Sequence, residues 1–62
     1  MSSNDYLEIH KEGSKYKVSL LDADTQNGTV IASERSLRKA IEKAKHTQES
    51  HRVEYGIHFG AI

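Results

Sequence analysis

Four histidines are the side chains of this chain with the most versatile chemistry: His10, His46, His51 and His58. Neutral imidazole is a common metal ligand, and its charge changes near neutral pH. The spacing of the four residues matches no zinc-site pattern, and the chain contains no Cys that would supply a thiolate. We therefore predict no metal and no other cofactor. If the first and last strands are neighbours, His10 and His58 meet across them as a pH-responsive pair.

The segment DADTQNG, residues 22–28, has the acidic and amide side chains of a calcium-binding loop. Such a loop needs Gly at its sixth position and a bidentate Glu at its twelfth. Counted from Asp22, the Gly is the seventh residue, and the twelfth is Ser33. The pair Asn27-Gly28 instead favours a turn, because both residue types tolerate positive φ.

No arrangement of residues typical of an enzyme occurs in the sequence. The nucleophile motif G-x-S-x-G, the Walker pattern and the dinucleotide motif G-x-G-x-x-G are all absent, and GIHFG, residues 56–60, has too few glycines to cradle a phosphate. A chain this short also offers little room for a substrate pocket. We predict that the protein is not an enzyme.

The length and charge of the chain limit the kinds of partner. With 62 residues it forms one domain, over residues 6–62, after a short polar tail, residues 1–5, that we expect to be disordered. Its net charge of zero argues against the uniform positive field of proteins that bind mainly phosphate. The start MSSNDYLEIH does not resemble a signal peptide, and no apolar stretch approaches the ~20 residues of a membrane span. We expect a cytoplasmic protein without a membrane partner.

Alternating side chains in the first third of the chain predict a β-hairpin around the turn KEGS, residues 11–14. One face is apolar and is expected to cover the core: Leu7 and Ile9, then Tyr16, Val18 and Leu20. The opposite face carries Tyr6, Glu8, His10, Lys15, Lys17, Ser19 and Leu21.

A third strand is predicted over TVIAS, residues 29–33, where Val30 and Ala32 are expected to face the core and Thr29 and Ile31 to point outward. A helix follows, because four apolar residues recur at helical spacing: Leu37, Ala40, Ile41 and Ala44. Ser33 is predicted to cap this helix, and TQESH, residues 47–51, to end it.

The last strand is predicted over RVEYGIHFGAI, residues 52–62. Val53, Tyr55, Ile57 and Phe59 alternate with Glu54, Gly56, His58 and Gly60. Because this is the most apolar strand, we expect it inside the sheet or well covered by the helix.

These elements predict an α+β fold with the element order β-β-β-α-β. A right-handed crossover through the helix places the last strand beside the first, which gives a four-stranded mixed sheet of order 3-2-1-4 with one helix packed on one face. The other sheet face remains open and is the candidate binding surface. Its residues are Tyr6, Glu8, His10, Lys15, Lys17, Leu21, Ile31 and His58.

We interpret the chain as a small regulatory or inhibitory module that contacts a partner protein, or a second copy of itself, through this face or an edge strand. The alternative is a nucleic-acid-binding domain that uses the cations of the same face. In the order of its elements, the segment from Tyr6 to His46 resembles the amino-terminal DNA-binding domains of some phage integrases. GTVIASERSLRKAIEKA resembles the strand-to-helix corner of double-stranded RNA-binding domains. These resemblances imply nucleic acid as the partner. A phage or mobile-element origin is compatible with a small regulatory module of this kind.

Overall fold

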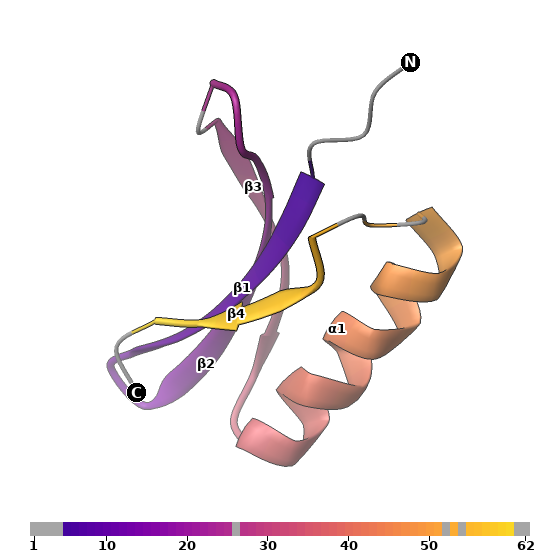
Figure 1. Ribbon diagram of the computed structural model, residues 1–62. Coiled ribbons are helices and arrows are strands. Elements are labelled where there is room, and N and C mark those ends of the chain that lie inside the picture. Colours follow the sequence, from indigo (N-terminus) through magenta and orange to yellow (C-terminus); the bar gives the residue numbers. More distant parts are fainter. Residues whose placement is uncertain (1–4, 26, 52, 54, 61–62) are drawn as a thin grey trace.

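A computed structural model describes residues 5–25, 27–51, 53 and 55–60. Its elements are β1 (Asp5–Glu12), β2 (Lys15–Asp22), β3 (Gly28–Glu34), α1 (Leu37–His51) and β4 (Ile57–Phe59). The sheet order is β3-β2-β1-β4, β4 runs parallel to β1, and α1 lies along one face of the sheet (Figure 1). The predicted α+β class, element order and strand order are confirmed. Residues 1–4 of the predicted tail lie outside the described residues, and the remaining one, Asp5, begins β1.

The hairpin of β1 and β2 forms because a two-residue turn matches the register of the two strands. Glu12 and Lys15 lie directly opposite each other, which leaves Gly13 and Ser14 as the loop. Gly13 has a φ of 66°, and tight hairpin turns require this positive value. The turn therefore fixes which side chains of the hairpin share a face.

The core lies between the hairpin and one side of α1. Leu7, Ile9 and Val18 are fully buried, and they meet Ala40 and Ala44 of the helix, which are also fully buried. The remaining members of the core and its border are Val53, Tyr16, Leu20, Ala32, Leu37, Ile41 and Ile57. The alternation predicted for the hairpin and the apolar stripe predicted for the helix are both present in this packing.

A β-bulge in the pairing of β2 with β3 changes the face on which Val30 lies. Val18 pairs with Ala32 but its neighbour Ser19 pairs with Val30, so Ile31 is the additional residue of β3. Val30 therefore shares the face opposite α1 with Ser19, and it is 54% exposed. The prediction that Val30 faces the core was wrong, because simple alternation does not continue through a bulge. Ala32 packs against the core as predicted.

Thr29 lies beyond the bulge, and its predicted orientation was wrong for the same reason. It pairs with Leu20, which packs against the core, so Thr29 shares the face that α1 covers.

The bulge predicts effects of very different size for two Val→Ala substitutions. Val18→Ala removes fully buried methyl groups and should lower the free energy of unfolding by about 2 kcal/mol. Val30→Ala should change it by less than about 0.5 kcal/mol, because that side chain is exposed. Urea denaturation of the two variants measures both values. A large loss for Val30→Ala would place Val30 in the core and contradict the bulge.

The helix begins later and ends later than the sequence predicts. Ser33 lies in β3, so it does not cap α1, and the carbonyl of Ser36 accepts the backbone hydrogen bond of Ala40 at 3.0 Å. Residues 47–51 continue the helix to His51, because Thr, Gln, Glu, Ser and His lower helix propensity only slightly. The prediction that this segment ends the helix was wrong.

The last strand is much shorter than predicted, and it forms an edge of the sheet. Its described part is limited to Ile57–Phe59, while residues 52, 54, 61 and 62, including Glu54, lie outside the described residues. Gly56 has a φ of 79°, which interrupts the alternation between Tyr55 and Ile57. Tyr55 and Phe59 are more than half exposed, so the expectation of an interior or well-covered strand was wrong.

Candidate functional site

The sheet face opposite α1, which we call the open face, is built from alternate side chains of the hairpin. Leu7 and Ile9 are buried under the helix, so Tyr6, Glu8 and His10 project from the other side of β1. Their cross-strand neighbours on β2 lie on this same face. These neighbours are Leu21 opposite Tyr6, Ser19 opposite Glu8, Lys17 opposite His10, and Lys15 opposite Glu12.

All eight residues predicted from the sequence for the binding surface are brought to the open face. His58 joins the face from β4, where it pairs with Glu8, and Ile31 joins it from the bulge of β3, 39% exposed. Four further open-face residues in the hairpin and β3 were not among the predicted eight: Glu12, Ser19, Val30 and Ser33.

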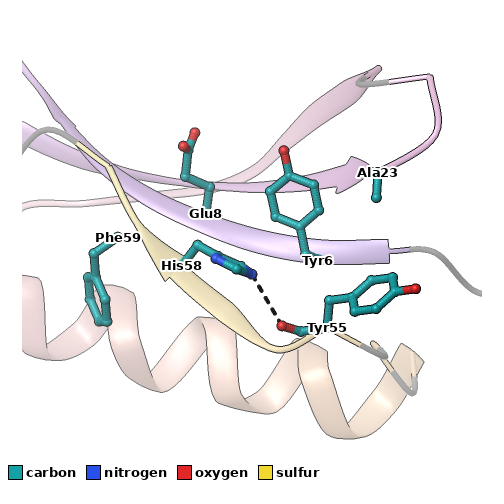
Figure 2. A pocket seen from close by; sticks show the side chains of 6 residues that line it. All are labelled: Tyr6, Glu8, Ala23, Tyr55, His58 and Phe59. Carbon is teal, nitrogen blue, oxygen red and sulfur yellow. Dashed lines mark hydrogen bonds between the residues drawn. The ribbon is translucent and has the colours of Figure 1, made fainter.

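Aromatic rings gather at the end of the open face where β1 meets β4. The rings of Tyr6 and His58 lie in edge contact, with their centroids 5.1 Å apart and their planes at 77°. Nε2–H of His58 donates a hydrogen bond to the carbonyl of Tyr55 at 3.2 Å (Figure 2). This bond orients the imidazole, and it requires a proton on Nε2 because a carbonyl oxygen only accepts.

Glu8 stands between the two histidines of the open face. Its Oε1 lies 3.8 Å from Nδ1 of His10, which is a loose contact and a charged one only when His10 is protonated. That Nδ1 is buried and has no hydrogen-bond partner among the described residues. His58 pairs with Glu8, and the residue beside His10 is Gly60, which follows β4. The predicted direct pairing of His10 with His58 therefore does not form. Gly60 leaves room for the Glu8 carboxylate, since a Cβ there would lie 3.2 Å from Oε2.

A shallow hollow of about 600 Å³ lies at this end of the open face. We call it the aromatic hollow; its lining residues are Tyr6, Glu8, Ala23, Tyr55, His58 and Phe59. Tyr6 and Glu8 point away from the helix, whereas the ring of Phe59 hangs on the helix side of β4 (Figure 2). Phe59 therefore contributes to the rim of the hollow. The Tyr6 side chain lies beside Glu8, and the Tyr55 ring lies at the other end of the hollow (Figure 2).

Sequence reasoning missed Tyr55 as a member of this site because simple alternation placed Tyr55 with Val53 and Ile57 on the strand face opposite His58. Gly56 was the available signal, since a glycine inside a strand pattern often marks an irregular backbone. The positive φ of Gly56 separates Tyr55 from the strand, and the Tyr55 carbonyl accepts the hydrogen bond from the His58 ring.

Among the described residues, no group of three or more His, Cys, Asp or Glu side chains is arranged to hold a metal ion. Within the same ranges, no helix has the length and apolar character needed to cross a bilayer. No protein-family model matches the chain, and neither the curated proteins nor the solved structures contain a match. The role of the open face is therefore inferred from its geometry.

Proposed function

We propose that this protein is a non-catalytic binding module that docks on a partner protein through its open face. The observation that supports this proposal is the composition of a sheet face that no described element covers. Leu21, Val30 and Ile31 lie on it among charged and aromatic side chains. Apolar residues mixed with rings and bordered by charges are typical of transient protein interfaces.

The charges of the open face favour a protein over a nucleic acid. Lys15 and Lys17 are the lysines of the hairpin part of this face, and Glu8 and Glu12 alternate with them across the two strands. Nucleic-acid affinity depends on cations that neutralise consecutive phosphates, and each glutamate here opposes that effect. A partner protein accommodates a mixed pattern, because it can present complementary charges of both signs.

The binding of a partner protein is tested with two variants that carry the same change in charge. Val30→Glu places a carboxylate on the open face without removing a buried side chain, whereas Ser50→Glu places one on the exposed surface of α1. The partner is captured with the wild-type protein, identified, purified and titrated by calorimetry against all three proteins. We expect Val30→Glu to weaken binding by about tenfold or more, because the interface would then bury an unpaired charge. Equal affinities for the two variants would show that the open face is not the docking surface.

Two measurements distinguish the other partners. A second copy of the chain as the partner would appear as a mass that rises with concentration in sedimentation experiments, and Val30→Glu would suppress the rise. Nucleic acid as the partner would appear in DNA and RNA titrations as affinity that falls steeply with salt and is lost in the double variant Lys15→Glu/Lys17→Glu. Either result would replace the proposed partner.

A further inference from the structure

The aromatic hollow has an unbalanced set of chemical groups. Among the described residues, its lining contains the carboxylate of Glu8 and no Lys or Arg. The nearest cation to that carboxylate within the described part of the chain is the imidazole of His10, 3.8 Å away and neutral unless protonated. The Glu8 side chain is 37% exposed, so its carboxylate is partly desolvated but still reachable from outside.

We propose that the aromatic hollow binds an arginine side chain of the partner protein. This inference rests on the proposed function, and it assigns one chemical contact within the docking surface. A guanidinium group supplies the permanent positive charge that Glu8 does not meet among the described residues, and its parallel N–H donors match the two oxygens of a carboxylate.

The rings of the hollow favour a flat cation. The ring planes of Tyr6 and His58 make an angle of 77°, so one ring presents its edge to the other. The two flat faces of that ring are therefore not covered by the other ring. Guanidinium stacks on such a face through both dispersion and cation–π attraction, whereas an ammonium group gains mainly the electrostatic part. The hydrogen bond from His58 to the Tyr55 carbonyl holds one wall in place before the ligand arrives. Less side-chain freedom is therefore lost on binding.

The same groups disfavour the other ligand that stacks on rings, a nucleotide. If a base stacked on these rings, the phosphate of the same nucleotide would lie near Glu8. The nearest lysine in the cross-strand register is Lys17, which lies opposite His10 and does not line the hollow. Like charges at this distance repel, so a nucleotide is expected to bind much more weakly than a cation.

The test uses two small probes that differ in charge but hardly in shape. N-acetyl-arginine N-methylamide and the corresponding citrulline compound are titrated into ¹⁵N-labelled wild-type protein at neutral pH and low ionic strength. We expect the arginine probe to shift the amides of Tyr6, Glu8 and residues 55–58 with a dissociation constant of about 1 to 10 mM. The neutral citrulline probe should give no saturable shift.

Two variants locate the charge that binds the probe. Glu8→Gln should lower the affinity for the arginine probe by about tenfold or more, because it removes the ion pair and keeps the size of the side chain. Glu12→Gln removes the same charge from the same strand and face, outside the hollow, and should bind the probe as the wild-type protein does. An unchanged amide spectrum outside the hollow verifies that both variants are folded.

Three results would overturn the inference. They are equal shifts with the citrulline and arginine probes, equal binding by Glu8→Gln and wild-type protein, and stronger shifts of the same amides with adenosine monophosphate. The titration with the partner protein distinguishes an error in the arginine contact from an error in the proposed function. If Val30→Glu loses the partner and Glu8→Gln retains it fully, the docking surface stands and the arginine contact is wrong.

Discussion

Replacing Ala44 with Glu is expected to leave the domain unfolded at 25 °C. Ala44 is fully buried where α1 meets the sheet, in a cluster with Leu7, Ile9 and Val18. A carboxylate at this position would be taken out of water into a cluster whose described members are all apolar, which costs several kcal/mol. A domain of this size has a total stability of only about 3 to 9 kcal/mol, at 0.05 to 0.15 kcal/mol per residue.

Ser50→Glu is the matched control, because it adds the same charge to an exposed position of the same helix. It should cost less than about 1 kcal/mol, mainly through repulsion from the negative end of the helix dipole. Circular dichroism and urea denaturation report both effects. A cooperative, wild-type-like transition for Ala44→Glu would mean that α1 covers the sheet with another of its faces.

The helix could be predicted from the sequence because its signal is redundant. Leu37, Ala40, Ile41 and Ala44 recur at the period of an α-helix, so the side that faces the sheet is specified several times over. The strand order followed from the right-handed crossover rule once the helix stood between two strands. Each conclusion depended on a pattern or rule that tolerates small errors in the boundaries of the elements.

The faces of Thr29 and Val30 in β3 could not be predicted, because they depend on one inserted residue. Val30, Ile31 and Ala32 are all compatible with the core, and an alternating pattern gives no indication of where a bulge interrupts it. The position of the bulge is determined by the pairing of β3 with Ser19 and Val18, which is tertiary information. The apolar part of the open face was underestimated for this reason.

The aromatic hollow escaped prediction for a similar reason. Its members come from β1, from Ala23 just after β2 and from both sides of Gly56, and the parallel pairing of β4 with β1 brings them together. Tyr6, Glu8 and His58 were correctly assigned to the open face from alternation alone. Tyr55 required knowledge of the backbone at Gly56, because its place depends on a positive φ that the sequence only permits.

Replacing His58 with Pro is expected to detach β4 from the sheet and to dismantle the aromatic hollow. Leu7 donates its N–H to the Gly56 carbonyl at 2.9 Å, and Gly60 donates its N–H to the Ile9 carbonyl at 2.8 Å. His58 lies midway between Gly56 and Gly60, and in a parallel ladder with this register its N–H also points toward β1. Proline removes that donor and leaves an acceptor of β1 without its partner.

His58→Pro is expected to lower the free energy of unfolding by about 3 kcal/mol. The contributions are an unpaired acceptor, a missing hydrogen bond and the loss of part of the burial of Ile57. Phe59→Pro is the matched control, because the N–H of Phe59 points away from β1 toward the free edge, where proline is tolerated. Hydrogen exchange at the Leu7 amide, whose acceptor is the Gly56 carbonyl, should accelerate strongly in His58→Pro and only slightly in Phe59→Pro. Equal acceleration in the two variants would contradict the parallel register on which the arrangement of His58, Glu8 and Tyr6 depends.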